Sequence, residues 1–194
     1  MSRYFIIYKP YDVLCQFSPE ENKKTLADLG FPFPKDVYPV GRLDEDSEGL
    51  LILTNDKSLN SQLLNPVRKH NRTYWVQVEG LFSAEAAKEI ENGVFIKVKD
   101  KEYLSLPGKV IPILEPQGIP DRIPPVRFRA NIPTSWISLT LHEGKNRQVR
   151  KMTAKVGFPT LRLIRYSIEN LILTKFIPAK VVELSEVEIY KLLR

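Results

Sequence analysis

A carboxylate and a guanidinium lie close together in the stretch from Val40 to Asp56, VGRLDEDSEGLLILTND. Asp44 follows Arg42 by two residues, so the two side chains can contact one ligand. Residues 49–54 form an apolar run that ends at an Asn-Asp turn pair, which is typical of a short buried strand. Because catalytic groups are often carried on loops held by a rigid strand, the stretch predicts that Asp44 is a catalytic carboxylate.

The same stretch allows two other interpretations. Asp, Glu and Ser ahead of a strand are ordinary turn residues, so the loop can simply be solvated. Alternatively, Asp44, Glu45, Asp46 and Glu48 supply oxygen ligands for a divalent cation. On an extended segment, however, Glu45 points away from the face that Asp44 and Asp46 share, and no histidine or second acidic cluster completes a site. The sequence therefore favours a metal-free carboxylate over a metal site.

Composition indicates a globular protein with an uneven charge. The chain has 194 residues, 43% of them hydrophobic, and a formal net charge of +6. Residues 1–56 contain 6 basic residues (Lys and Arg) and 10 acidic ones (Asp and Glu). Residues 57–139 contain 12 basic and 8 acidic residues, and residues 140–194 contain 11 basic and 5 acidic residues. One domain of this size can bury a substantial core. The basic end suits a polyanion such as nucleic acid or acidic lipid.

Cysteine and histidine usage limits the possible chemistry. Cys15 is alone, so no intramolecular disulfide can form, and a reducing compartment is expected. His70 and His142 are the only histidines, and this excludes zinc sites of the usual spacing. No apolar run reaches the length of a membrane span or of a secretory signal. These features predict a cytoplasmic protein.

Periodicity predicts an alternation of strands and helices. Proline separates the first two strands, which are expected to open the fold as a hairpin or meander. The proline-rich region 107–133 is expected to be an extended excursion over the surface. The predicted strands are 4–8, 13–17, 49–54, 73–79, 94–103, 136–141 and 161–167, and the predicted helices are 25–29, 57–64, 83–92, 146–156 and a last one opened by a capping box at Ser185 and Glu188.

An aromatic residue and cations occur together at the start of the strand 73–79. Tyr74 shares one face of that strand with Val76 and Val78, and Arg72 precedes it on the same face. An aromatic side chain beside cations suits stacking on a nucleic-acid base. The alternative is that Tyr74 packs in the core.

The helix 146–156 has two distinct faces. Val149, Met152, Thr153 and Val156 form an apolar face at helical spacing. A second face carries Arg147, Arg150 and Lys151, so the helix presents a basic stripe. The positive charge of an arginine at a helix N-terminus is repelled by the positive end of the helix dipole. An anion bound there is attracted by both the dipole and the arginine. The stripe therefore indicates either an anion site or a solvated basic face.

Three segments resemble the pseudouridine synthases of the RsuA type: GRLDEDSEGLLILTND from Gly41, RTYWVQVEG from Arg72 and LHEGKNRQVRKMTAKVG from Leu141. Two further segments, IPTSW from Ile132 and GFPTLRLIRYSI from Gly157, fit the branch that modifies large-subunit ribosomal RNA. Three motifs in order at compatible spacing are a specific signal. The resemblance covers nearly the entire chain.

The resemblance implies an α+β pseudouridine synthase fold, in which a mixed, mainly antiparallel sheet is flanked by helices and two lobes surround a catalytic cleft. It implies one catalytic domain over residues 1–194, without the N-terminal S4-like RNA-binding domain of many relatives. The implied partner is ribosomal RNA, and the implied reaction needs no cofactor and no metal. The enzyme is expected to act as a monomer that binds no membrane.

The resemblance also implies roles for individual residues. Asp44 is the essential aspartate, Tyr74 is the aromatic that stacks on the target base, and Arg150 is the basic partner of the aspartate. Arg42 is expected to help expel or replace the flipped base. The remaining predicted RNA-binding residues are Arg72, Lys145, Arg147, Gln148 and Lys151.

The implied reaction breaks the bond from sugar C1′ to base N1, rotates the held base and rejoins it through C5. The uridine must first leave its stack, which costs roughly a few kcal/mol and requires a pocket with stacking and hydrogen-bonding groups. A carboxylate near C1′ can act as a nucleophile or assist proton removal from the sugar, and the sequence leaves both routes open. A cation paired with Asp44 favours its ionised form at neutral pH.

Two other classes of function compete with this one. A non-catalytic RNA-binding or ribosome-assembly protein would keep the scaffold, although the presence of Asp44, Tyr74 and Arg150 argues against it. A metal-dependent nuclease would use the acidic loop and would lose its activity in chelator.

Overall fold

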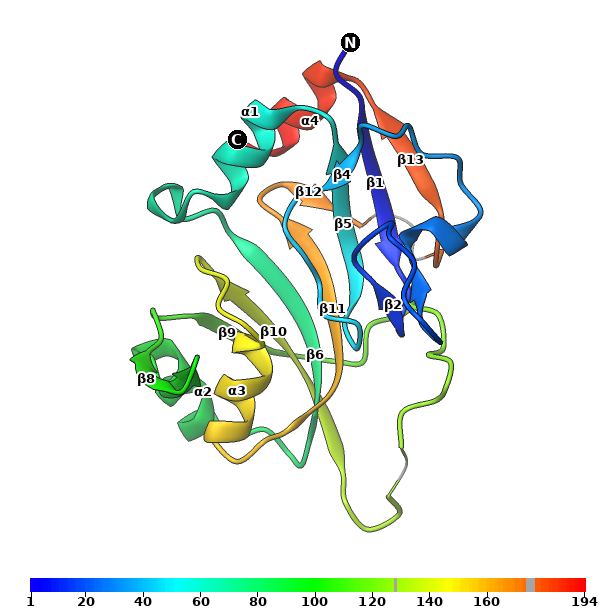
Figure 1. Ribbon diagram of the computed structural model, residues 1–194. Helices are drawn as coiled ribbons and strands as arrows, with labels where there is room; N and C mark the ends of the chain where they lie inside the picture. Colours follow the sequence, from blue (N-terminus) through cyan, green and yellow to red (C-terminus); the bar gives the residue numbers. More distant parts are fainter. Residues whose placement is uncertain (128, 174–176) are drawn as a thin grey trace. The chain divides into compact units, whose positions relative to one another are not determined.

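The chain divides into two compact units in a computed structural model that describes residues 1–127, 129–173 and 177–194 (Figure 1). The first unit contains Met1–His70 and Arg165–Arg194, and the second contains Asn71–Ile164. Residue 128 of the predicted proline-rich excursion lies outside the described residues. Within the described part of the chain, no helix combines the length and the hydropathy that a membrane span requires.

The first unit combines a sheet with two α-helices. Its elements are β1 (Tyr4–Lys9), β2 (Val13–Leu14), β3 (Lys24–Thr25), the 3-10 helix η1 (Leu26–Leu29), β4 (Tyr38–Pro39), β5 (Glu48–Thr54), α1 (Lys57–Leu64), the 3-10 helix η2 (Pro66–Arg68), the second half of β11 (Thr160–Ile168), β12 (Leu171–Ile172), β13 (Val181–Leu184) and α4 (Glu186–Leu192). The sheet has the strand order β13-β1-β5-β11, with β4 beside β5 and β12 beside β11. Strand β1 therefore lies between β5 and β13, and it pairs antiparallel with both.

The core of the first unit follows from the apolar runs of β1 and β5. Their register places Phe5 opposite Leu53 and Ile7 opposite Leu51. These four side chains are 0–1% exposed, and β5 is buried along its whole length. Burying each such side chain contributes roughly 1.5–3 kcal/mol. The predicted strand 49–54 is confirmed, and its burial makes it a rigid support for the loop that precedes it.

A carboxylate joins three elements of the first unit at the start of α1. Asp56 Oδ1 accepts the backbone N–H groups of Ser58 and Leu59, which caps the helix. Its Oδ2 accepts the hydroxyls of Tyr4 in β1 and Tyr190 in α4, both at 2.8 Å. Helices α1 and α4 consequently lie side by side (Figure 1). The predicted helix 57–64 is confirmed.

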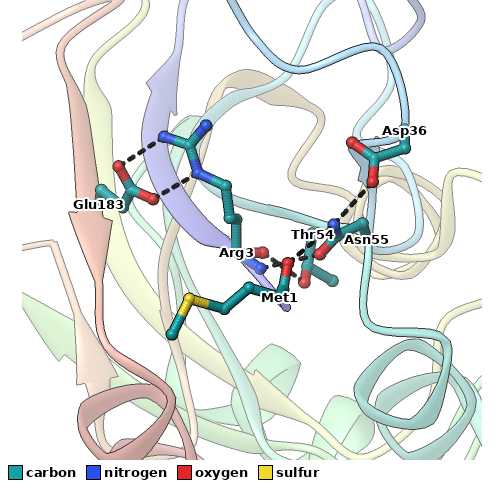
Figure 2. A network of polar contacts seen from close by, with 6 residues as sticks. All are labelled: Met1, Arg3, Asp36, Thr54, Asn55 and Glu183. Atoms are coloured by element: carbon teal, nitrogen blue, oxygen red, sulfur yellow. Dashed lines mark hydrogen bonds and ion pairs between the residues drawn. The ribbon is translucent and has the colours of Figure 1, made fainter.

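A polar network fixes the first residues of the chain on the sheet, as Figure 2 shows. The Arg3 guanidinium donates to both oxygens of Glu183, at 2.7 and 2.8 Å. The Arg3 N–H donates to Asn55 Oδ1, and the Thr54 hydroxyl donates to the Arg3 carbonyl oxygen. Asn55 in turn donates to Asp36. The network ties the start of β1 to β13 and to the end of β5.

The prediction that a hairpin opens the fold is wrong. Strand β2 has only two residues, and it pairs parallel with β3 instead of with β1. Between β1 and β2 the chain turns at Asp12, which has a φ of 60° and donates its N–H to Glu45 O at 3.0 Å. This turn directs the chain toward the loop ahead of β5, away from the β1 ladder. The helical turn at Leu26–Leu29 is confirmed as η1, capped by Thr25.

The second unit also combines a sheet with two α-helices. Its elements are β6 (Arg72–Glu79), α2 (Ala84–Asn92), β7 (Phe95–Val98), β8 (Lys101–Leu104), β9 (Lys109–Ile113), β10 (Thr134–Leu141), α3 (Gln148–Lys155) and the first half of β11. The strand order is β11-β6-β10-β9, and β10 pairs antiparallel with β6 and β9. Val76 of β6, Ile137 of β10, Ile90 of α2 and Met152 of α3 share one core, each 0% exposed. Both helices therefore pack on one face of this sheet.

Two parts of the second unit differ from the prediction. The predicted strand 94–103 is a hairpin of β7 and β8, because Lys99 and Asp100 both have positive φ, 48° and 61°, as two-residue hairpin turns require.

The proline-rich region begins with β9, and the loop that follows is held by guanidinium groups. Arg122 donates to the carbonyl oxygens of Pro124 and Pro125, and Arg162 donates to a third carbonyl of that loop, at residue 120.

The predicted α+β class is confirmed. The described residues contain four α-helices together with the strands of a mixed sheet, and the strands do not close into a barrel. Strand β1 pairs antiparallel with β5 and β13, and β10 pairs antiparallel with β6 and β9, whereas the short β2–β3 pair is parallel. Each unit carries part of the predicted site, on the loop ahead of β5 in the first and on β6 and α3 in the second.

Candidate active site

Asp44 lies in a tight turn immediately before β5. The N–H of Ser47 donates to the Asp44 carbonyl oxygen at 3.0 Å, which closes the turn. The N–H of Val40 donates to the Ile52 carbonyl oxygen at 2.8 Å, which ties the beginning of the loop to β5. Asp44 is half-buried and Arg42 is exposed. The loop therefore holds the half-buried Asp44 on a fixed backbone, with the exposed Arg42 two residues before it.

The ammonium group of Lys9 holds the backbone next to Asp44. Lys9 is 0% exposed, at the end of β1. Its Nζ donates to the carbonyl oxygens of Pro10 at 2.9 Å, Val13 at 2.7 Å and Glu45 at 3.3 Å. An ammonium has three hydrogens, so all three are used. The buried charge is thereby compensated, and Glu45, the neighbour of Asp44, is fixed in place.

The other acidic side chains of the loop have separate partners. Glu45 forms an ion pair with Lys23, at 2.6 Å. Glu48 is 3% exposed and accepts the Tyr8 hydroxyl at 2.8 Å. In the described ranges of the chain, no group of three or more His, Cys, Asp or Glu side chains is arranged to hold a metal ion. The acidic residues of this loop therefore do not converge on one point.

The backbone of Arg165 comes very close to Gly49, the second residue of β5. Gly49 has a φ of +107°, and a Cβ placed on it would lie 2.4 Å from the Arg165 carbonyl oxygen. The Arg165 side chain is 4% exposed, and its Nε donates to the Leu50 carbonyl oxygen at 2.7 Å. Only glycine fits this approach and this backbone angle. Gly49 is visible in the sequence, but the backbone that approaches it comes from a distant segment, which the sequence alone does not identify.

The buried Lys9 ammonium predicts a pH-dependent stability. Burial lowers the pKa of Lys9 to about 8, from an ordinary value of 10.5. Between these two values the unfolded chain binds a proton that the folded chain has lost, so the Lys9 contribution to the free energy of unfolding rises with pH. From about pH 8 to about pH 9.5, we expect wild type to gain about 2 kcal/mol relative to Lys9→Met, measured by urea unfolding.

The comparison with Lys9→Met cancels the titration of all other groups. A constant difference between the two proteins across this range would show that Lys9 keeps its ordinary pKa. If the variant does not fold, the Lys9 Cε resonance of the wild-type protein supplies the same information, because its chemical shift follows the protonation state. We expect that resonance to titrate near pH 8.

Tyr74 lies where the apolar face of β6 leaves the core. Val76 and Val78 on this face are 0% exposed, as the alternation predicted. Tyr74 is half-buried and packs against the core cluster of the second unit, opposite Leu139 of β10. Arg72, the first residue of β6, is also half-buried. Part of the Tyr74 ring therefore packs in the core, and part remains accessible.

Helix α3 has the two faces that the sequence predicted. Val149, Met152 and Thr153 are at most 5% exposed. Arg150 and Lys151 are half-buried, whereas Arg147 is exposed and occupies the N-cap position with a φ of 52°. No side-chain hydrogen bond caps the helix N-terminus in this part of the described chain. The helix begins two residues later than predicted, because Arg147 adopts a left-handed conformation.

Gln148, the first residue of α3, is buried. It is 4% exposed, its Nε2 donates to Glu143 Oε1 at 2.6 Å, and its Oε1 accepts the Lys145 N–H at 2.9 Å. Both ends of its amide are thus used inside the protein. The RNA contact of Gln148 stays a prediction, and the hydrogen bonds of its side chain hold the loop that precedes α3.

The predicted site residues fall into two groups, one in each unit. The first unit carries Asp44 and Arg42. The second unit carries Arg72, Tyr74, Lys145, Arg147, Gln148, Arg150 and Lys151. Lys9 was not among the predicted residues. A lysine soon after the apolar run FIIY is nevertheless a signal in the sequence, because its charge would need buried partners.

Comparison with known proteins identifies the class of enzyme to which this fold and these residues belong. Residues 3–155 match the family described as RNA pseudouridylate synthase. The chain belongs to the pseudouridine synthase family, and it is an enzyme of the isomerase class. The resemblance of its motifs to that family is thereby confirmed.

Individual relatives support the same assignment. The chain is 50% identical to a ribosomal large subunit pseudouridine synthase E of Vibrio vulnificus, over 93% of this chain and 74% of that protein. It is 46% identical to a protein of the same name from Xanthomonas axonopodis pv. citri, over 84% of each. A solved structure of a pseudouridylate synthase has a TM-score of 0.79 at 24% identity, covering 99% of this chain and 74% of its own, and shows the fold.

Proposed function

We propose that this chain isomerises a specific uridine to pseudouridine in ribosomal RNA of the large subunit, with Asp44 as the catalytic carboxylate. The observation that carries the proposal is the Asp44 turn. Asp44 is half-buried, and its backbone is fixed by Ser47 and by Lys9 through Glu45. A catalytic group held in one geometry before substrate arrives avoids much of the entropic cost of reaction. The relatives named for large-subunit ribosomal RNA support the choice of substrate.

The reaction requires a carboxylate at the sugar of the flipped uridine. The C1′–N1 bond breaks, the base rotates, and a C1′–C5 bond forms. The proton on C5 leaves to solvent, and N1 takes up a proton, so the product is an isomer. Asp44 acts as a nucleophile at C1′ or removes a proton from the sugar.

The remaining residues bind and orient the RNA in this proposal. Tyr74 presents the accessible part of its ring for stacking on the target base. Arg150 is the cationic member of the catalytic set, and Arg42 replaces the flipped base in the RNA. The residues proposed to bind phosphates are Arg72, Lys145, Arg147 and Lys151.

Release of tritium from RNA tests the proposed function. Large-subunit ribosomal RNA, transcribed with uridine tritiated at C5, is incubated with the protein in chelator. Joining the sugar to C5 must expel that hydrogen, so we expect tritium to appear in water in proportion to the pseudouridine formed. Release in chelator would also exclude the metal-dependent nuclease.

Binding without release would support a different function. If the protein binds the RNA but releases no tritium from free RNA or from a precursor ribosomal particle, the ribosome-assembly alternative is favoured. Release from small-subunit RNA alone would overturn the proposed substrate while leaving the reaction intact.

Truncation of Tyr74 tests the stacking role. Base stacking on an aromatic side chain contributes about 1–3 kcal/mol, so Tyr74→Ala is expected to reduce kcat/KM for tritium release by about 5- to 150-fold. Tyr74→Phe retains the ring, and its activity should stay within about threefold of wild type. Equal losses in the two variants would instead assign the effect to the hydroxyl.

A further inference from the structure

A buried carboxylate belongs to the loop between β10 and α3, which also carries Lys145 and Arg147. Glu143 is 9% exposed and follows β10. Its Oε2 accepts the Tyr103 hydroxyl at 2.5 Å, and its Oε1 accepts the Leu106 N–H at 2.8 Å and the Gln148 Nε2 at 2.6 Å. These three donors are uncharged and come from three separate segments. Glu143 therefore joins the β7–β8 hairpin and the chain after it to the start of α3.

Hydrogen bonds and one cation–π contact join Glu143, Gln148, Lys145 and Tyr103 into a closed ring. Gln148 accepts the Lys145 N–H on its side chain and donates its own N–H to the Lys145 carbonyl oxygen, at 2.9 and 3.1 Å. The Lys145 ammonium lies over the Tyr103 ring, 4.7 Å from its centroid. The Tyr103 hydroxyl returns to Glu143. Each member thus restricts the position of the next.

The segment around Glu143 is otherwise basic. Residues 140–155 contain one acidic side chain, Glu143, among two arginines and three lysines. An exposed carboxylate in this segment would repel RNA phosphate. The buried Glu143 instead accepts hydrogen bonds from uncharged groups of the protein, and these bonds hold the loop in shape. The exposed Arg147 keeps a left-handed conformation, which is unfavourable for a residue with a Cβ and requires support from its surroundings. Gln148, the next residue, supplies such support.

We propose that Glu143 and Tyr103 are positioning residues, which hold Lys145 in the orientation in which it binds RNA phosphate. The inference rests on the proposed function, because that function makes Lys145 an RNA contact. A lysine side chain loses considerable rotamer freedom when it binds. Since the Tyr103 ring already restricts the Lys145 ammonium, less freedom is lost on binding, and affinity is higher.

The test measures the affinity for ribosomal RNA, because affinity does not depend on turnover. Tyr103→Phe keeps the ring and removes the hydroxyl that Glu143 holds, and we expect its Kd to rise about tenfold. Lys145→Met should raise Kd and lower the slope of log K against log salt by about 0.7–0.9, as loss of one phosphate contact does. The double variant should bind about as weakly as Lys145→Met alone, since Tyr103 acts through Lys145.

A matched control separates positioning from a general loss of stability. Tyr190→Phe also removes a hydroxyl that donates to a carboxylate, but this carboxylate is Asp56 of the first unit. Its Kd should stay within about twofold of wild type, whatever its unfolding free energy. Glu143→Gln keeps the side-chain shape and should weaken binding as Tyr103→Phe does, with kcat nearly unchanged.

Two results would overturn the inference. If the effects of Tyr103→Phe and Lys145→Met on Kd multiply in the double variant, Tyr103 does not act through Lys145. If Tyr103→Phe leaves Kd and its salt dependence unchanged, the hydroxyl has no positioning role. A wild-type protein that binds RNA but releases no tritium would contradict the proposed function alone, because these Kd comparisons would still decide the inference.

Discussion

Asp44→Asn is expected to lower tritium release by at least about a thousandfold, because removal of a catalytic carboxylate eliminates the step that it performs. Asparagine has nearly the same shape, so the turn closed by Ser47 and the Lys9 contact with Glu45, which both use backbone atoms, should persist. Affinity for ribosomal RNA should therefore change by no more than about threefold. Single-turnover tritium release and Kd, measured on the same preparations, check both expectations.

Asp46→Asn is the matched control for this prediction. It removes the same charge two residues away, and the two acidic side chains share the loop ahead of β5. We expect Asp46→Asn to keep at least about a third of wild-type activity. Equal release by wild type and Asp44→Asn would remove Asp44 from its proposed role. Equally severe losses in both variants would indicate that the charge of the loop matters and that the identity of the carboxylate does not.

Local sequence signals predicted much of the framework that holds these residues. Helix 57–64 was predicted with its observed bounds, because Asp56 caps it and Pro66 prevents its continuation. The strand 49–54 was predicted from its apolar run, and β5, at Glu48–Thr54, confirms it and is buried along its whole length. In these cases the residues that determine the element belong to the element or adjoin it.

Predictions failed where distant residues determine the local conformation. The expected opening hairpin does not form, because the N–H of Asp12 bonds to Glu45, more than thirty residues away. The role of Lys9 was missed for the same reason, since one of its three acceptors is the Glu45 carbonyl oxygen. The burial of Gln148 on Glu143 becomes visible only when β10 and α3 are placed together. Such contacts leave no periodic pattern in the sequence.

Gly49→Ala is expected to destabilise the first unit by about 4 kcal/mol or more, which is severe for one methyl group. Two costs add. A residue with a Cβ at a φ of +107° is strained by about 1–3 kcal/mol. The new Cβ would also lie 2.4 Å from the carbonyl oxygen and 2.7 Å from the nitrogen of Arg165, both backbone atoms that can move only if the strands separate. Urea unfolding of wild type and variant measures the loss.

Gly30→Ala separates the two costs, because Gly30 has a φ of +73° with no atom within 4 Å of the added Cβ. Only the backbone strain applies there, so we expect a loss of about 1–2 kcal/mol. The excess loss in Gly49→Ala then measures the close approach of Arg165. Similar losses at both glycines would contradict that approach. A large excess would show that this contact between β5 and β11 fixes the strand on which the Asp44 loop is built, so that a substitution five residues from Asp44 abolishes activity through the fold.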